Sequence, residues 1–174
     1  DNQAYQFIST YRKRFTLPEP LNGRRLFIDF DGAMISSQVY LNQHRLGEYD
    51  GGFTPFSFDL TDHLIDGENV LQVRLDSTER TDIPPYGYVV DYLTFGGIYR
   101  DVTLRYVEPV HISDIFVRGA DVLSDHPRAQ ADVTVNNLSG RDREIVVYLS
   151  IPETQASGSA IITVPAGDRA TAVF

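Results

Sequence analysis

The stretch AQADVTVN, Ala129 to Asn136, alternates apolar and polar residues at every step, with Val133 and Val135 among the apolar ones. Successive side chains of a β-strand point to opposite faces, so this alternation is typical of an antiparallel strand with one buried face. The stretch Glu144 to Ile151 places further apolar residues at every second position, namely Ile145, Val147, Leu149 and Ile151. The two stretches therefore predict half-buried strands of one β-structure.

The same period of two continues through the rest of the chain, and helical periodicity is nearly absent. Segments rich in β-branched and aromatic residues, bounded by Gly, Pro, Asn or Asp, are expected to be strands. They are Thr10–Thr16, Leu26–Phe30, Ile35–Leu41, Phe56–Leu60, Val70–Leu75, Tyr99–Val107, His111–Arg118, Ala129–Asn136, Glu144–Ile151, Ala160–Val164 and Ala170–Phe174. The predicted fold class is all-β.

Turn chemistry separates several of these strands. Leu41 to Gly47 is predicted as a hairpin, because Asn and Gly residues tolerate a positive φ. Asp66 to Asn69 is predicted as a tight turn. The segment Thr61 to Ile65 predicts one helical turn, with Thr61 or Asp62 as its cap.

A change of composition at Glu108-Pro109 predicts a domain boundary, since aromatic residues are dense before it and Val, Ser, Ala and Asp dominate after it. We expect residues 1–108 to form a jelly-roll-like sandwich and residues 109–174 a smaller one. An immunoglobulin-like sandwich uses about seven strands, and the second region offers fewer. It is therefore predicted to be C-terminally incomplete, as in a piece of a longer protein, and its unpaired edge predicts a homo-oligomer.

Composition excludes several classes of function. The formal net charge of −9 and the pI near 4.8 disfavour a nucleic-acid surface, which needs clustered Lys and Arg. No run approaches the roughly 20 apolar residues that cross a bilayer, so no membrane partner is expected. With no Cys, disulfides and thiolate metal sites are excluded. The compartment stays open between the cytoplasm and a secreted or periplasmic location in a bacterium.

The residues themselves indicate no catalytic centre. No Ser stands in a Gly-x-Ser-x-Gly elbow, and Gly96-Gly97 lacks the strand-turn-helix context of a phosphate loop. No two of the four histidines are spaced for a shared metal: His44, His63, His111 and His126. Carboxylates for glycoside hydrolysis would have to come from Asp29, Asp31, Asp50, Asp59, Asp91 or Asp101, and the sequence does not pair them.

One loop carries a functional signal. Thr81 to Gly97 is long for a connection between strands, rich in Tyr and Phe, and has Asp91 near its centre. Aromatic faces cover the C–H surface of sugars while a carboxylate accepts hydrogen bonds from hydroxyls, so the loop suits a carbohydrate; covering a neighbouring domain is the alternative. Its Ile83-Pro84-Pro85-Tyr86 start is predicted to be extended, with trans X-Pro bonds.

The order of several motifs resembles the N-terminal part of glycoside hydrolase family 2, which contains β-galactosidases, β-glucuronidases and β-mannosidases. Tyr40-Leu41-Asn42 with Leu46-Gly47 is similar to a family hairpin, with Gln43 where Gly is common. The other motifs that carry the resemblance are Tyr11–Pro18, Gly51–Thr61, Gly67–Val73, Ile83–Pro85 and Gly96–Val102, and Val110–Ile115 is similar to the start of the second domain.

The resemblance implies a jelly-roll sugar-binding domain, then an immunoglobulin-like sandwich, then a catalytic (β/α)8 barrel. In the family both catalytic glutamates lie on the barrel, so this chain would be a non-catalytic fragment with the barrel of the same parent chain as its partner. The family places an Asp five residues before its Gly-Gly-Ile-Tyr-Arg-like motif, on a loop that reaches the sugar. Here that residue is Asp91, which implies substrate binding. The only inorganic ligand implied is a monovalent or divalent cation near the parent's active site.

The branch of the family is read from two segments. Asp76 to Pro85 and Asp91 to Gly97 look most like β-galactosidases, which implies a β-galactoside ligand, while β-glucuronidases share the Ile-Pro-Pro element. A free-standing carbohydrate-binding or adhesion module with no barrel attached is the alternative from another class.

Overall fold

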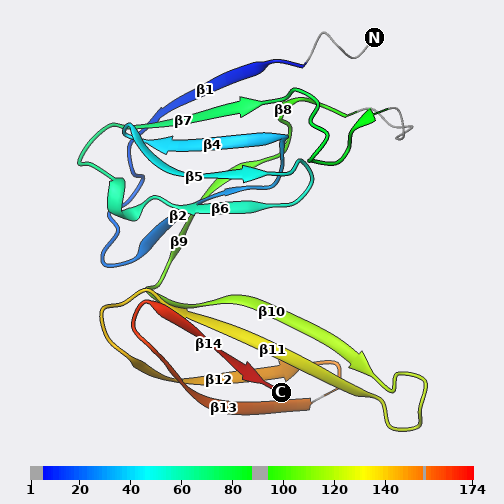
Figure 1. Cartoon of the computed structure of the whole chain (residues 1–174). Coiled ribbons are helices and arrows are strands. Elements are labelled where there is room, and N and C mark those ends of the chain that lie inside the picture. The colour runs from blue at the N-terminus through cyan, green and yellow to red at the C-terminus, as the bar shows by residue number, and fades with distance from the viewer. Residues whose placement is uncertain (1–5, 88–93, 155) are drawn as a thin grey trace. The chain divides into compact units, whose positions relative to one another are not determined.

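The computed structural model describes residues 6–87, 94–154 and 156–174, and the chain divides into two compact units, 1–106 and 107–174 (Figure 1). Strands dominate both units, and the described ranges contain no α-helix and one 3-10 helix. The all-β class is thereby confirmed.

The first unit contains three β-sheets. Its elements are β1 (Ile8–Phe15), β2 (Arg25–Phe30), β3 (Ala33–Met34), β4 (Ser36–Leu41), β5 (His44–Asp50), β6 (Phe56–Asp59), the 3-10 helix η2 (Thr61–His63), β7 (Asn69–Asp76), β8 (Gly97–Ile98) and β9 (Val102–Val107). The sheets have the strand orders β1-β7-β4-β5, β6-β2-β9 and β3-β8. The two larger sheets enclose the core, and the short β3-β8 ladder lies at one end of the unit.

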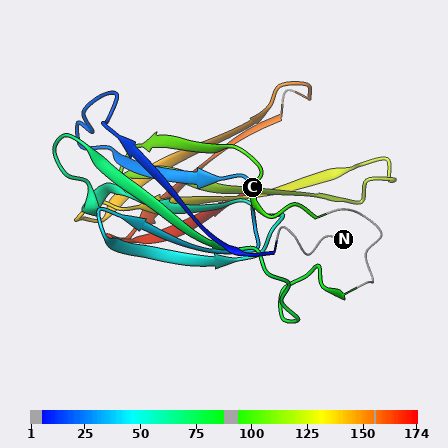
Figure 2. The same ribbon diagram turned by 90° about the horizontal axis from the view of Figure 1, so that it is seen from above.

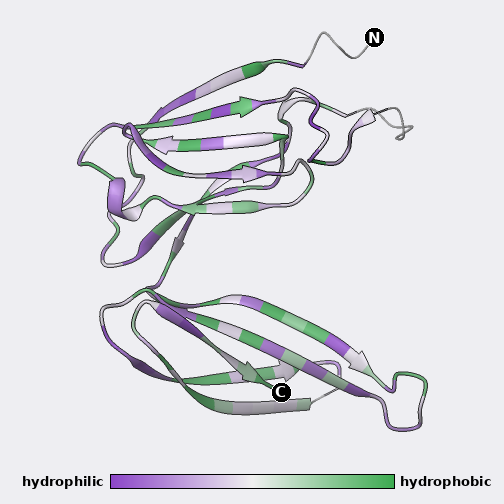
Figure 3. Cartoon of the chain, viewed as in Figure 1, coloured by the Kyte–Doolittle hydropathy of each residue, from purple (hydrophilic) through white to green (hydrophobic). Residues whose placement is uncertain are grey.

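The period of two in the sequence becomes the core of this sandwich. Leu26, Ile28 and Phe30 of β2 are at most 2% exposed, while the residues between them are half-buried. Every second residue of β4 and β7 is buried in the same way. Figure 3 shows that hydrophobic and hydrophilic residues alternate along these strands. The core is completed by Val39, Leu41, Phe56, Leu60, Leu71, Val73 and Leu75.

A polar staple joins the three strands β6, β2 and β9. Arg105 binds Asp29 through two hydrogen bonds, Nε to Oδ2 at 2.6 Å and Nη2 to Oδ1 at 2.9 Å. Ser57 Oγ donates to the same carboxylate at 2.5 Å. These donors, Arg105 foremost, hold the pKa of Asp29 below its usual range. Asp29 is thus engaged as a structural group.

Two asparagines tie the β4–β5 turn to the connection before β7. Asn69 is fully buried, and its Oδ1 accepts hydrogen bonds from Asn42 Nδ2 at 2.8 Å and from the Ile65 amide at 3.0 Å. Asn42 also donates to the His63 carbonyl at 2.8 Å and accepts from the Val70 amide at 2.9 Å. Because buried polar groups must be paired, these amides fix both turns.

The second unit is a smaller pair of sheets, β10-β11-β14 and β12-β13. Val133, Val135, Val147, Val164 and Ala172 form its buried core. The strands are β10 (Val110–Ala120), β11 (Arg128–Asn137), β12 (Arg143–Ile151), β13 (Ala156–Val164) and β14 (Asp168–Val173). Two predicted strands, at 129–136 and 144–151, are therefore confirmed as the centres of β11 and β12.

The differences from the sequence predictions are local. Strands β3, β5 and β8 were not predicted; β5 lies at a sheet edge, carries a mixed sequence, and its register against β4 shifts between Val39 and Tyr40. The predicted cap of the helical turn was wrong, because Leu60 occupies the N-cap of η2 and no side chain caps it there. Asp59 Oδ1 instead accepts the Thr61 amide hydrogen bond at 2.9 Å.

The hairpin turn at Asn42-Gln43 carries positive φ values of 50° and 72°. A positive φ is unfavourable for Gln43, whereas Gly adopts it without a steric penalty. Gly also loses more backbone entropy on folding, which offsets part of this gain, so Gln43→Gly should stabilise the protein by about 0.5 kcal/mol. Gln43→Ala keeps the unfavourable φ and is the matched control. The free energy of unfolding from urea titration checks this; a gain for Ala equal to that for Gly would contradict it.

Candidate functional site

The base of the aromatic loop is closed by one hydroxyl. Ser77 directly follows β7, and its Oγ donates to the Met34 carbonyl at 2.9 Å and accepts from the Gly97 amide at 3.1 Å. Gly97 pairs with Met34 in the β3-β8 ladder. The start and the end of the segment 77–97 therefore meet at the same point of β3.

A small apolar cluster lies beside the base of the loop. Ile83 is 7% exposed and packs with Met34 and Ile35, with Tyr99 against the cluster. Tyr99 Oη also donates to the Gly52 carbonyl at 2.6 Å. The segment after Ser77 is thus attached to the sandwich again at Ile83.

The backbone at the start of the loop differs from the sequence prediction. The Pro84-Pro85 bond is cis, so the trans expectation was wrong; for an X-Pro bond the two isomers differ by only about 0.5–1 kcal/mol. The Met34-Ile35 bond is also cis. Residues 83–85 form bends and residue 86 has no regular structure, so the segment that was predicted to be extended lies in neither a strand nor a helix.

Charged side chains surround the start of the loop. Arg80 binds Asp82 in a bidentate pair at 3.0 and 2.6 Å and reaches Asp50 at 3.5 Å. The Arg80 guanidinium lowers the pKa of Asp82, and hydrogen bonds from Thr78 lower the pKa of Asp76. Glu79 accepts a hydrogen bond from the Gly87 amide. Asp50 and Asp82 are thus paired with Arg80, and Asp76 and Glu79 accept hydrogen bonds from backbone amides.

Aromatic side chains around the same end remain accessible. Phe53, Tyr86 and Phe95 are 43%, 47% and 65% exposed. The exposed rings of Tyr86 and Phe95 are of the kind that covers the C–H surface of a sugar, while the neighbouring charged groups are paired with one another. This end of the first unit is the candidate carbohydrate-facing surface.

The predicted site residue Asp91 lies within 88–93, outside the described residues. Of the other candidate carboxylates, Asp29 binds Arg105, Asp50 faces Arg80, and Asp59 binds Arg25 at 2.7 Å. Asp31 and Asp101 lie side by side, because the Asp31 amide donates to the Asp101 carbonyl at 3.0 Å. Sequence reasoning missed Ser77 and Met34. The signal that could have found Ser77 is its position directly after a strand and before a long loop.

Two of the four histidines lie side by side in the structure. His44 and His63 stack with ring centroids 4.8 Å apart, and His111 Nδ1 contacts the Glu108 carbonyl oxygen at 2.9 Å. Across the described part of the chain, no group of three or more His, Asp or Glu residues could hold a metal ion. No helix in that part is long and apolar enough to cross a membrane.

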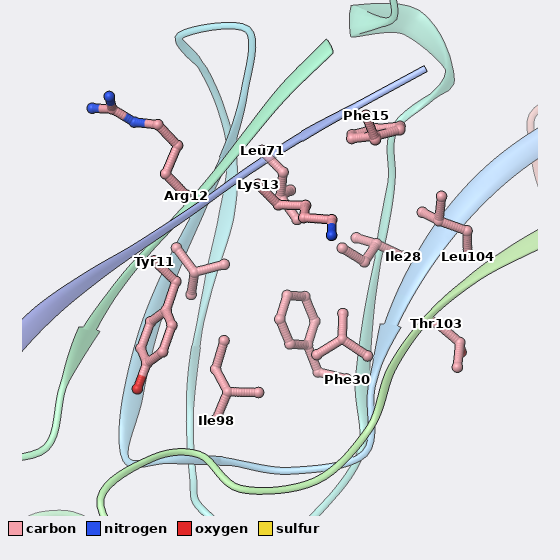
Figure 4. A pocket seen from close by; sticks show the side chains of 12 residues that line it. Tyr11, Arg12, Lys13, Phe15, Ile28, Phe30, Leu71, Ile98, Thr103 and Leu104 are labelled. Atoms are coloured by element: carbon pink, nitrogen blue, oxygen red, sulfur yellow. The ribbon is translucent and has the colours of Figure 1, made fainter. Parts of the chain in front are cut away.

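A cleft of about 460 Å³ opens elsewhere in this unit, between β1 and β9. Figure 4 shows Tyr11 and Lys13 beside the core residues Ile28 and Phe30 that line it. Lys13 pairs with Leu71 in the β1–β7 ladder and so lies on the core side of β1. Its lining is mainly apolar, and its polar side chains are those of Tyr11, Arg12, Lys13 and Thr103.

Comparison with known proteins identifies the first unit. Residues 5–85 match the family described as glycosyl hydrolase 2 galactose-binding domain-like. The chain is 45% identical over 116 residues to a β-galactosidase of Thermoanaerobacter pseudethanolicus, which covers 66% of this chain and 16% of that protein. It is 39% identical over 154 residues to the β-galactosidase of Thermoanaerobacterium thermosulfurigenes, covering 87% of this chain and 21% of that one.

A solved structure extends the likeness to both units. The Bacteroides uniformis β-glucuronidase superposes with a TM-score of 0.86 at 27% identity, over 98% of this chain and 21% of that chain. The chain therefore spans about a fifth of the length of these relatives. Its all-β fold is that of the N-terminal sandwich domains of glycoside hydrolase family 2.

The closure of the loop base can be tested in the isolated chain. Ser77→Ala removes the acceptor of the Gly97 amide and the donor to the Met34 carbonyl, and should destabilise the first unit by about 1–2 kcal/mol. Amide hydrogen exchange should show faster exchange at Gly97. Ser57→Ala, which removes the exposed donor to Asp29, is the control and should leave Gly97 exchange unchanged. Unaltered protection of Gly97 in Ser77→Ala would contradict the assignment.

Proposed function

We infer the function of this chain from its family, because residues 5–85 belong to the glycosyl hydrolase 2 galactose-binding domain-like family. We propose that the chain is a non-catalytic N-terminal portion of a retaining exo-glycosidase of the β-galactosidase type. In that role it helps to complete the sugar subsite of a catalytic barrel on the same parent chain.

The 45% identity to a β-galactosidase is the observation that carries this proposal. The structural likeness to a β-glucuronidase, at 27% identity, supports a second branch of the same family. The two branches differ in the substituent at C5 of the sugar, which is a neutral hydroxymethyl group in a galactoside and a carboxylate in a glucuronide, and in the configuration of the hydroxyl at C4. We favour the galactoside because the sequence likeness is greater on that side.

Asp91 is the proposed sugar-binding residue of the chain. Its flanks are held at Ile83, packed on Met34 and Ile35, and at Gly97, bonded to Ser77. Asp91 therefore lies in sequence between two points that are attached to the sandwich, and we propose that this attachment keeps its carboxylate near the same sugar hydroxyls. The exposed Tyr86 and Phe95 supply aromatic surface on either side of it in sequence.

The chemistry of the reaction is proposed to come from outside this chain. Retaining glycosidases use two carboxyl groups about 5–5.5 Å apart, one as the nucleophile and one as the acid and base. Among the candidate carboxylates that the structure describes, Asp29, Asp50 and Asp59 are instead paired with arginines. The role left for this chain is to bind and orient the substrate, and the second unit is proposed to be the immunoglobulin-like spacer, C-terminally incomplete, of the parent.

The isolated chain is expected to hydrolyse neither nitrophenyl galactoside nor nitrophenyl glucuronide, because it supplies no nucleophile and acid pair. Release of nitrophenol is measured against a buffer blank and against heat-denatured chain. Turnover that co-purifies with the chain through a second column would overturn the non-catalytic role.

In the full-length parent, Asp91→Asn should lower kcat/KM for the galactoside by roughly tenfold to a few hundredfold, since charged hydrogen bonds contribute about 1.5–3 kcal/mol. The melting temperature should be nearly unchanged. Asp82→Asn is the matched control, because Asp82 is exposed and pairs with Arg80 nearby, and its kcat/KM should stay within about twofold of wild type.

Two results would decide against parts of the proposal. Wild-type kcat/KM for Asp91→Asn would show that Asp91 is not in the sugar subsite. A parent that prefers the nitrophenyl glucuronide over the galactoside would assign it to the β-glucuronidase branch while leaving the role of Asp91 standing.

A further inference from the structure

The longest strand of the second unit lies at the edge of its sheet. β10 pairs with β11 on one side, and in the strand order β10-β11-β14 no strand of the described residues pairs with its other side. Large apolar side chains along it are exposed: Ile112, Ile115, Phe116 and Val117 are between 53% and 57% accessible. A long apolar strand with an open edge is a template for pairing with another strand.

The core side of β10 is also uncovered. Ile115 and Val117 pair with Val133 and Ala131 of β11, and residues paired across a ladder share a face of the sheet. Val133 and Ala131 are only 2% and 4% exposed, whereas Ile115 and Val117 on the same face are 53% and 57% exposed. Figure 2 shows the β10–β11 and β12–β13 hairpins diverging toward their tips, so the second sheet leaves the β10 side of this face open.

Edge strands are usually protected by charge, and β10 carries little of it. In the first unit, edge strand β1 has Arg12, Lys13 and Arg14 in succession, so pairing with a second β1 would place like charges together. β10 contains neither Lys nor Pro. Its charged side chains other than His are Asp114 and Arg118, which are opposite in sign.

The spacing of these two charges selects one partner and one register. Asp114, Phe116 and Arg118 share one face of β10, because side chains alternate along a strand. If two copies of β10 pair antiparallel about Phe116, Asp114 of each copy lies opposite Arg118 of the other, and Phe116 lies opposite its own mate. On the other face, Ile115 lies opposite Val117 of the second copy.

We propose that β10 is a homodimerisation strand, which pairs antiparallel with β10 of a second copy about a two-fold axis at Phe116. The interface is isologous, as a two-fold axis requires. Arg118 already lies over the Phe116 ring at 5.7 Å and binds Asp132 at 3.0 Å, so its side chain is held on the face where the second Asp114 would arrive. The proposal concerns the second unit and does not depend on the sugar-binding role.

The neighbouring registers are less favourable. A shift of the axis by one residue, to Ile115 or Val117, removes both Asp114–Arg118 pairs and sets each charge opposite an apolar residue. Cross-strand pairs of opposite charge are stabilising and like charges directly opposite are destabilising. The charges therefore specify the register.

Single cysteines test the register directly, because the chain has no cysteine of its own. Residues directly opposite in an antiparallel pair have Cα atoms about 4.5–5.5 Å apart, within the range of a disulfide. Phe116→Cys should therefore form a covalent dimer on mild oxidation. Ala120→Cys is the matched control on the same strand; its two copies would lie about 26 Å apart and should stay monomeric on a non-reducing gel.

A charge change tests the association without a crosslink. Asp114→Arg would place Arg opposite Arg118 twice and should weaken the dimer roughly tenfold or more in sedimentation equilibrium. Asp125→Arg makes the same change of charge in the exposed loop after β10 and should dimerise as wild type. Circular dichroism and thermal melting identify any variant that fails to fold, and Asp114→Asn is then the milder substitute.

The proposal is overturned if the wild-type chain is a monomer at high micromolar concentration, or if Cys at 116 crosslinks no better than Cys at 120. It is also overturned if Asp114→Arg and Asp125→Arg dimerise equally, because association would then use another surface such as the β13 edge.

Discussion

The hydroxyl of Ser77 is the contact on which the arrangement of the candidate site depends. It joins the end of β7, the carbonyl of Met34 on β3 and the amide of Gly97 on β8, three segments that are far apart in sequence. The β3-β8 ladder and the hydrogen bond from the Ile35 amide to the Asp76 carbonyl at 3.1 Å connect the same segments through the backbone, and Ser77 is the side chain that bonds to both β3 and β8. The loop therefore has a fixed base, and the burial of Ile83 attaches its first part to the same region.

Buried side chains with polar groups recur at the turns of both units. Asn69 and Asn42 hold two connections of the first unit together. In the second unit, the fully buried Asn137 donates to the carbonyls of Arg141 and Val164 at 2.8 and 2.9 Å. Apolar contacts in a core have no preferred direction, whereas a buried side-chain amide is stable only when it forms hydrogen bonds with specific partners. The apolar alternation therefore forms the sheets, and these amides fix the loops between them.

The period of two in the sequence was sufficient to predict the all-β class and the central strands, because strands such as β2 and β7 bury every second residue. It was insufficient for β5, where Leu46 is an extra residue between the pairs Val39–Gly47 and Tyr40–Arg45, and for the two-residue strands β3 and β8. The aromatic loop was visible from composition. Its anchors at Ser77, Met34 and Ile83 were not, because contacts between distant segments leave no local pattern. Asp91 came from resemblance alone, and its role stays a prediction.

The two units differ in how their edges are protected, and this separates their proposed roles. Edge strand β1 carries three consecutive basic residues, whereas β10 presents an apolar strand with one charge of each sign. The first unit is then free to present one end to a sugar, and the second is available for association.

The most direct test of the account is a crystal structure of the full-length parent with a galactose-type inhibitor in its active site. The account predicts that an Asp91 carboxylate oxygen lies within about 3.2 Å of a sugar hydroxyl, with Ser77 and Gly97 still bonded at the loop base. A bound sugar with the segment 83–97 turned away from it would contradict the account.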